Sequence, residues 1–531
     1  TEIFPTVDPG QFQLRLQAPT GTRIGRTEEL TRQALDAIGE AVGPDNVGIT
    51  VSYVGVVPAS YPINDVYLWT SGPHEAVLRV ALKPGSGVRI DELKERLRRD
   101  LPVRLRSWLK YALLRDGLKE QEAAAKVRAI RLSFEPADIV NEVMSFGSPT
   151  PVEIAVSGPK LNESRAFAEK IRAQLDDIPS LRDLHFAQPL DYPTVDVHVD
   201  REKLGRMGGS VRDVTESVIA ATSSSRFMVP LYWPDPNTGI GFQVQVEIPK
   251  EHMRSALDLE TLQVLGGPAG TLRVRDIGDV KNGAMPGEYD RYNMRRLVSM
   301  TANIEGEDLG RVADRIDQAV RAVGQPPRGA SVDVRGQITP MRQMFSELGF
   351  GLLLAVIAIF LLLTAYFQSP LLALVVILTA PAVMLGVMLA LAVTGTTLNI
   401  QSFMGAIMAM GVAMANAILL VTFSERARRG GVDVAKAAVE AGSQRLRPIL
   451  MTTCAMIAGM IPLALGLGEG GEQMAPLGRA VIGGLIAATM TTLLVLPSLF
   501  ALIMGRASTV SRSLDPEDPE SRYHSAAPAG H

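Results

Sequence analysis

The chain has 531 residues, with 53 basic and 56 acidic side chains and a net charge of −3 at neutral pH. This balance gives no reason to expect a nucleic-acid partner, and the single cysteine, Cys454, excludes an intrachain disulfide. Apolar residues make up 47% of the chain and gather after residue 340, which predicts a mixed-charge region followed by a membrane region.

Residues 11–134 combine two kinds of hydrophobic periodicity. Apolar residues alternate over the expected strands and recur every three to four residues over the expected helices. Strands are expected at 11–19, 47–53, 76–82 and 129–134, and helices at 26–42 and 91–109. Two strand–helix–strand patterns in succession predict a split, ferredoxin-like sheet.

The same pattern returns after residue 150, but it is interrupted. Its first half is expected at 151–157, 162–178 and 181–186, and its second half at 297–304, 308–323 and 330–335. The roughly 100 residues between the halves predict an inserted unit. In it we expect strands at 195–199, 242–248 and 271–276, a helix at 211–222 and a hairpin at 230–241. The charged residues of 1–340 are interpreted as solvated faces.

Five apolar stretches follow, each about 20 residues long, which is the length that crosses a hydrocarbon core. They are expected to be helices, because a helix satisfies its own backbone polar groups in lipid. The predicted spans are 348–367, 371–393, 403–423, 449–467 and 480–504. The fold class is therefore α+β domains followed by an all-α bundle of five transmembrane helices.

Lysine and arginine mark the cytoplasmic loops of membrane proteins. The linker between spans three and four carries Arg426, Arg428, Arg429, Lys436, Arg445 and Arg447, whereas residues 468–477 carry neither residue type. This predicts a cytoplasmic C-terminus and places residues 1–340 outside the cytoplasm. Because the chain opens on Thr1 without a signal peptide, we expect an upstream transmembrane segment that belongs to a larger protein.

Polar groups inside the spans are the best candidates for function, because they are costly in lipid. Asn416 lies in the third span and is interpreted either as a member of a polar relay or as a hydrogen-bonding contact between helices. Thr452 and Thr453 can bond to carbonyls of their own helix. Arg445 lies at the membrane edge, where its long side chain reaches polar surroundings. No Asp or Glu lies between 348 and 423, within 449–467 or within 480–504, so a proton acceptor is expected elsewhere.

No enzyme signature stands out, and no cofactor or catalytic residue is expected. The sequence lacks the phosphate-binding GxxxxGK[ST] run, and its six histidines show no zinc-ligand spacing. Methionine pairs in the third span leave a soft-metal path open, although methionine is an ordinary packing residue. These methionines are Met404, Met408, Met410 and Met414.

Several segments, taken in chain order, resemble the C-terminal half of resistance–nodulation–division (RND) efflux permeases. The segments are 4–11, 272–280, 291–293, 411–420, 425–428, 437–442, 445–453 and 459–464. The resemblance implies a proton-driven homotrimer in the bacterial inner membrane that needs the N-terminal half of the same permease. It also implies a periplasmic adaptor and an outer-membrane channel as partners, and periplasmic placement of 1–340.

The resemblance further implies a division of the chain and three relay residues. The first porter subdomain would be 1–135, the second 136–190 with 293–340, the docking subdomain 191–292, the membrane region 341–505 and a disordered cytoplasmic tail 506–531. Asn416, Arg445 and Thr452 match polar positions of the family, but Ala415 stands where drug exporters often carry lysine. The family's paired aspartates lie in the absent half. The loop 54–73 matches the region that gates the drug pocket, so Tyr61, Tyr67 and Trp69 are candidate substrate contacts.

Export of amphiphilic compounds is therefore the predicted function. Two alternatives remain: efflux of heavy-metal ions on the same scaffold, and a membrane scaffold that does not transport. A carboxylate at membrane depth in the missing half, facing Asn416, would favour transport, whereas Met or Cys pairs along the cleft would favour a metal.

Overall fold

The first α/β unit is a four-stranded antiparallel sheet covered by helices on one side. The computed structural model describes residues 1–5, 8–56, 68, 70–137, 143–145, 147–249, 252–253, 255–264, 272–467 and 471–507. The strand order is β2-β3-β1-β4, the order of a split, ferredoxin-like sheet. Its elements are β1 Gln11–Gln17, α1 Ile24–Val42, β2 Val47–Val54, β3 Glu75–Leu82, α3 Ile90–Arg115, α4 Glu120–Val127 and β4 Arg131–Glu135.

The second α/β unit repeats this arrangement. Its strands lie in the order β6-β14-β5-β15, which is the same order when each unit is numbered by itself, and a short β13 Arg291–Tyr292 adds to β14. Its other elements are β5 Val152–Ser157, α6 Leu161–Leu175, β6 Leu181–Phe186, β14 Arg295–Ile304, α11 Leu309–Val323 and β15 Ser331–Gly336. Every pairing in both sheets is antiparallel.

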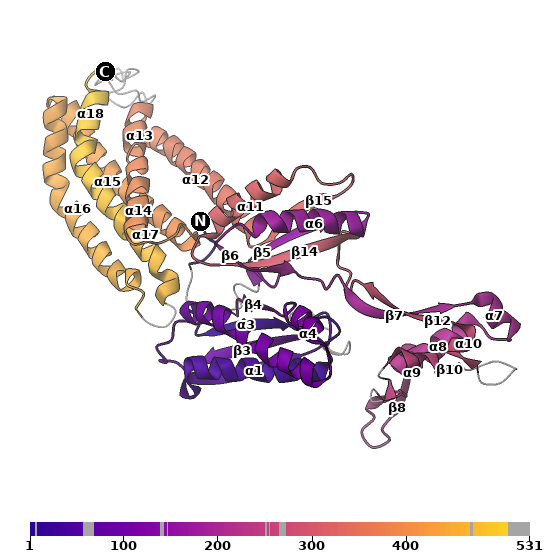
Figure 1. The fold of residues 1–531 in the computed structure, drawn as a ribbon. Coiled ribbons are helices and arrows are strands. Elements are labelled where there is room, and N and C mark those ends of the chain that lie inside the picture. The colour runs from indigo at the N-terminus through magenta and orange to yellow at the C-terminus, as the bar shows by residue number, and fades with distance from the viewer. Residues whose placement is uncertain are drawn as a thin grey trace.

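The inserted unit projects away from the second sheet on a two-stranded ribbon of β7 and β12 (Figure 1). Its elements are β7 Tyr192–Val199, α7 Arg201–Arg206, α8 Val211–Thr222, β8 Leu231–Pro234, β9 Gly241–Val244, α9 Ala256–Glu260, β10 Gln263–Val264, β11 Leu272–Arg273, α10 Val274–Ile277 and β12 Gly278–Met285. The predicted hairpin is present as β8 paired with β9.

Two of the predicted strands in the inserted unit are wrong in extent. The strand expected at 242–248 ends at Val244. The one expected at 271–276 is only β11, because the carboxylate of Asp276 accepts the backbone N–H of Arg273 at 3.0 Å and starts the turn of α10. The ribbon strand β12 was not anticipated, since Gly278 and Gly283 weaken its β-strand signal.

The strands nearest the junction of the two units are buried on both faces. On β14, Val298, Met300 and Ala302 enter the apolar core of the second unit. The residues that alternate with them, Ser299, Thr301 and Asn303, are also buried. The amide of Asn303 donates to the hydroxyl of Ser133 on β4 at 3.1 Å. The polar faces of the strands therefore meet each other rather than water.

Five helices of the described residues are long and apolar enough to cross a membrane. They are α12 Ile338–Phe367, α13 Pro370–Ile377 continued by α14 Ala380–Val393, α15 Ile400–Arg429, α16 Val434–Ala464, and α17 Gly471–Met490 continued through a π-helical turn, Thr491–Val495, into α18 Leu496–Met504. They form one bundle beside the α/β units (Figure 1). Together with the two sheets they confirm the predicted fold class.

The helices extend beyond the predicted spans. The linker expected between spans three and four is almost wholly helical, because the carboxylate of Asp433 accepts the N–H groups of Ala435 and Lys436 and starts α16 at once. The linker expected at 468–477 is wrong over its second part, since α17 begins at Gly471. Spans two and five are each divided at a proline. Pro381 lies in the first turn of α14, and Pro497 follows the π-helical turn of span five. The predicted tail lies outside the described residues after residue 507.

Spans two and five cross through glycine at backbone contact distance. A Cβ added to Gly483 would lie 2.6 Å from the carbonyl oxygen of Gly386 and closer still to the Cβ of Ala390. Gly405 makes a similar approach to the carbonyl of Leu477. Small residues at a crossing let two helices approach closely, which is the main source of packing attraction in lipid.

We expect Gly483→Ala to destabilise the bundle by about 1–3 kcal/mol, the usual cost of overpacking. Gly411→Ala on α15 is the matched control, because a Cβ there meets nothing within 4 Å. The measurement is the thermal unfolding midpoint of the purified protein in detergent. Equal midpoints for the two variants would contradict the close crossing.

Candidate functional site

The two α/β units are joined at the carboxylate of Asp183 on β6. This carboxylate accepts three hydrogen bonds, from the Arg98 guanidinium, the Asn303 amide and the backbone N–H of Phe134, each at 3.0 Å. Arg98 and Phe134 belong to the first unit, on α3 and β4, whereas Asn303 belongs to the second. A buried carboxylate with three donors is well satisfied, so Asp183 links the two units at this point in the structure.

The backbone at Asp183 is itself unusual. Its φ is 56°, in the left-handed region that non-glycine residues rarely adopt. Aspartate tolerates this region better than most residues. The position therefore combines local backbone strain with a carboxylate that accepts hydrogen bonds from both units. Strained backbone conformations of this kind cluster at functional sites.

A second buried charge pair lies on the same side of the first sheet. The guanidinium of Arg15 on β1 donates to both oxygens of Glu135 on β4, at 2.5 and 3.1 Å, and the Gln13 amide donates to Glu135 at 2.7 Å. Arg15 and Glu135 are almost fully buried. The expectation that charged residues of 1–340 lie on solvated faces is therefore wrong for Arg15, Glu135 and Asp183.

His185 lies beside this cluster and is only 6% exposed. Its Nδ1 donates to the carbonyl of Asp183 at 2.6 Å, and its Nε2 is 3.5 Å from the hydroxyl of Thr301. Burial lowers the pKa of His185, and the charge of Glu135 only partly opposes this. The imidazole is therefore held neutral.

Three hollows follow the junction of the units. The largest, about 630 Å³, lies on the membrane side and is lined by residues of both units together with Thr397 and Gln473 at the ends of the spans. A second, about 280 Å³, shares Arg98 and Phe134 with the first. A third, about 540 Å³, shares Arg131 and Arg172 with the second. Arg98 and Phe134 thus stand between the membrane-side hollow and the hollow of about 280 Å³.

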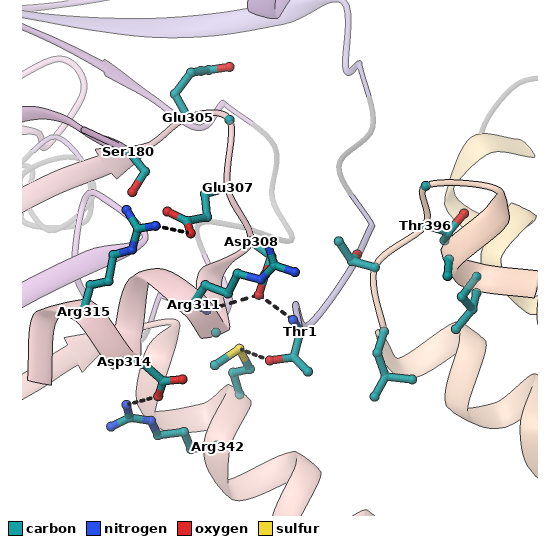
Figure 2. A pocket seen from close by; sticks show the side chains of 18 of the residues that line it. Thr1, Ser180, Glu305, Glu307, Asp308, Arg311, Asp314, Arg315, Arg342 and Thr396 are labelled. Atoms are coloured by element: carbon teal, nitrogen blue, oxygen red, sulfur yellow. Dashed lines mark hydrogen bonds and ion pairs between the residues drawn. The ribbon is translucent and has the colours of Figure 1, made fainter. Parts of the chain in front are cut away.

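Figure 2 shows a further hollow, of about 1030 Å³, between α11 and the loop after α14. Its charged side chains form ion pairs, some of them with residues that do not line the hollow. Arg315 contacts Glu307 at 3.1 Å, and Arg342 contacts Asp314 at 3.7 Å and Asp317 at 2.7 Å. Asp308 accepts the backbone N–H of Arg311 at the start of α11. This pairing leaves little surplus charge for a ligand.

The predicted polar residues of the spans are not joined to one another. Asn416 on α15 is half-buried, and its side chain makes no hydrogen bond with any residue that the structure describes. The guanidinium of Arg445 lies 3.9 Å from the centroid of the Phe423 ring, a cation–π contact between α16 and α15. Thr452 is exposed and donates to the carbonyls of Pro448 and Ile449 in its own helix.

A polar contact between spans four and five was missed. Thr453, which was expected to bond within its helix, lies 2.9 Å from the hydroxyl of Thr489 on α17. Farther along span five, Thr492 is 1% exposed, and its hydroxyl has no partner among the described residues. It lies in the π-helical turn, a type of distortion often found at functional sites. Pro497 is the sequence signal that could have indicated a distortion here.

The remaining expectations concern substrate and metal. Tyr61, Tyr67 and Trp69 lie outside the described residues. In the described ranges, no group of three or more His, Cys, Asp or Glu side chains could hold a metal ion. Met410 and Met414 are buried in the bundle, whereas Met404 and Met408 are exposed. The two methionine pairs therefore lie on different faces of α15.

Two ferredoxin-like units, one with an insertion, joined to a bundle of apolar spans define a multi-pass membrane protein of the permease type. Residues 1–504 match the family described as AcrB/AcrD/AcrF, and the chain belongs to this family. The resemblance to RND permeases is thereby confirmed.

Several named proteins are similar to the chain. It is 28% identical over 390 residues to the cobalt-zinc-cadmium resistance protein CzcA of Cupriavidus metallidurans, covering 72% of this chain and 36% of that protein. Protein HelA of Legionella pneumophila is 30% identical over 387 residues, with 71% and 36% covered. The swarming motility protein SwrC of Bacillus subtilis is 27% identical over 361 residues, with 68% and 34% covered. The aligned part of the chain thus covers about a third of the length of each of these relatives.

A solved structure shares the fold. The crystal structure of a heavy metal efflux pump, crystal form II, matches 95% of this chain and 48% of its own with a TM-score of 0.77 and 23% sequence identity. At that identity the likeness concerns the fold alone.

The neutral His185 predicts a pH dependence of stability. Because its pKa is lower in the folded chain than the unfolded value of about 6.5, folding is opposed once the pH falls below that value. We expect acidification from about pH 7.5 to about pH 5 to lower the thermal midpoint more in the wild-type protein than in His185→Gln. Burial raises the pKa of Glu153 and Glu305, which acts in the opposite direction in both proteins. Parallel pH profiles would contradict the assignment.

Proposed function

We propose that the chain is the C-terminal part of an RND-type efflux transporter of the bacterial inner membrane. The observation that carries this is the combination of two facing α/β units with five apolar spans in a member of the AcrB/AcrD/AcrF family. Hollows between the α/β units offer a route for a substrate outside the membrane. The transporter works only when the N-terminal half is present, since the same aligned residues are 68% of this chain but 34% of SwrC, which makes that relative about twice as long.

The α/β units lie in the periplasm and the C-terminus in the cytoplasm. Support comes from the basic residues around α15 and α16, of which Arg428 and Arg429 both pair with Glu425 at the end of α15. Residues 468–477 at the opposite end of the bundle carry no Lys or Arg. The units at 1–135 and at 136–190 with 293–340 act as porter subdomains, and 191–292 acts as the docking subdomain. The working assembly is a homotrimer with a periplasmic adaptor and an outer-membrane channel.

Proton-motive force drives the export. The five spans carry no acidic residue in their apolar parts, so the proton acceptor lies in the N-terminal half and faces Asn416. This chain contributes two groups to the relay: the amide of Asn416, which has no partner among the described residues, and the guanidinium of Arg445. Thr452 takes part after its hydroxyl turns away from the carbonyls of its own helix.

The substrate is a small amphiphilic compound. Heavy-metal efflux is the second candidate, favoured by the names of the relatives CzcA and the nickel and cobalt resistance protein CnrA. The first candidate is supported by the hollows between the α/β units, where the carboxylates of Glu135 and Asp183 are already bound to arginines.

Transport is tested by dye efflux from cells that make this chain alone or joined to the N-terminal half. Efflux is expected only with both halves, and a protonophore should abolish it because the acceptor is titratable. Cobalt, zinc and cadmium accumulation is measured in the same cells. Efflux of metal but not dye would support the second candidate, proton-dependent efflux from this chain alone would contradict the placement of the acceptor, and no export of either would favour a scaffold.

The relay is tested by Asn416→Ala in the joined protein. We expect proton-driven efflux to fall about fivefold or more, the range in which coupled sites affect one another. Thr422→Ala is the matched control, because Thr422 lies on the same helix and its hydroxyl donates to Ile418 of that helix at 2.7 Å. A similar loss in both variants, or none in Asn416→Ala, would remove Asn416 from the relay.

A further inference from the structure

Arginines from both α/β units converge on the hollow of about 280 Å³ beside the Asp183 junction. Arg98 and Arg106 come from α3, Arg131 from β4 and Arg172 from α6. Arg98, Pro102 and Arg106 recur every four residues, so they follow one face of their helix. Four guanidinium groups from three elements thus line one small space, which is henceforth the arginine pocket.

The arginine pocket contains a surplus of positive charge. Its one acidic lining residue is Asp183, whose carboxylate is taken by Arg98, Asn303 and Phe134. Arg172 has a loose contact of 3.7 Å with Asp176 and lies 5.7 Å from the Phe186 ring. The guanidinium groups of Arg106 and Arg131, two exposed residues, have no ion pair or hydrogen bond with the described residues. Partial desolvation lowers the pKa of Arg131 and repulsion by Arg172 lowers it further, although the residue is exposed by its solvent-accessible surface.

This arrangement differs from the surrounding surface. Several other basic groups on the same helices are matched by acids: Arg104 with Glu40, and Arg165 with Asp191 and Glu169. The whole chain even has a small excess of acidic residues. Like charges collected without partners repel one another, so a mobile anion in the arginine pocket would relieve that repulsion.

The walls of the arginine pocket are apolar. Ile130, Leu132, Phe134 and Leu184 line it together with Pro102. Such walls reduce screening by water only in part, because Arg106 and Arg131 are themselves exposed. Guanidinium groups also match the geometry of carboxylate, phosphate and sulfate oxygens, with which they form paired hydrogen bonds.

We propose that the arginine pocket binds the anionic group of a small molecule, with Arg106 and Arg131 as its principal ligands. The group is a carboxylate, phosphate or sulfate, and it is either a free anion or part of a molecule with an apolar body. The apolar walls and the adjoining hollow of about 540 Å³ give room for such a body. A divalent metal cation is disfavoured here by the same charge. The site does not depend on the transport proposed above.

Binding is measured by isothermal titration of the purified full chain in a non-ionic detergent. The probes are inorganic phosphate, 1-naphthyl phosphate and uncharged 1-naphthol. Arg106→Gln combined with Arg131→Gln should weaken binding of the anions about tenfold or more, since paired charged hydrogen bonds are lost. Arg99→Gln is the matched control, because Arg99 is exposed on the same helix and does not line the pocket. It should leave binding within about twofold of wild type.

The probes also separate the two sources of the anion. Equal binding of both phosphates supports a free anion, and tighter binding of 1-naphthyl phosphate supports a molecule with an apolar body. Arg131→Lys keeps the charge but loses the paired hydrogen bonds, so it should weaken anion binding less than the double variant, and it replaces the double variant if that one does not fold. The proposal is overturned if the wild-type chain binds neither anion, if 1-naphthol binds as well as its phosphate, or if Arg99→Gln loses as much binding as the double variant.

Discussion

The carboxylate of Asp183 is the point on which the arrangement of the two α/β units depends. It accepts a charged donor from one unit, a neutral amide from the other, and a backbone N–H of β4. Removing one partner from such a buried set leaves the others unsatisfied, which is costly. Arg98 and Phe134 also stand between the hollows of about 630 and 280 Å³. The contact with Asp183 therefore helps to divide the space between the α/β units.

The two halves of the chain are held together by different forces. The α/β units meet through polar side chains such as Asn303 and Ser133, and polar interfaces of this kind are typical of parts that move relative to each other. The spans instead pack through glycine and alanine at backbone contact distance, as Gly386 and Gly483 do. That crossing leaves little freedom. Relative motion within this chain is therefore expected between the units, not between spans two and five.

The sequence predicted the repeated units because their cores follow simple periodicities, and the same holds for the five spans. It did not predict the junction. The alternation of residues on β14 puts Ser299 and Asn303 on a polar face. A polar face that packs against a second sheet has the same sequence pattern as one that contacts water. The helix ends were also missed, since a single carboxylate such as Asp433 extends a helix through polar sequence. The contact between Thr453 and Thr489 depends on how two helices cross, which periodicity does not encode.

The charge of the cleft bears on the choice of substrate. A metal site needs free carboxylate, imidazole or thiolate groups, but Glu135 is bound to Arg15 and Asp183 to Arg98, while His185 donates to a backbone carbonyl. The relatives named for metals are 27–28% identical to this chain, and one fold can carry different sites. The arginine pocket adds repulsion toward cations. These contacts support the amphiphilic substrate that we propose, and efflux of metal ions stays the alternative named by the relatives.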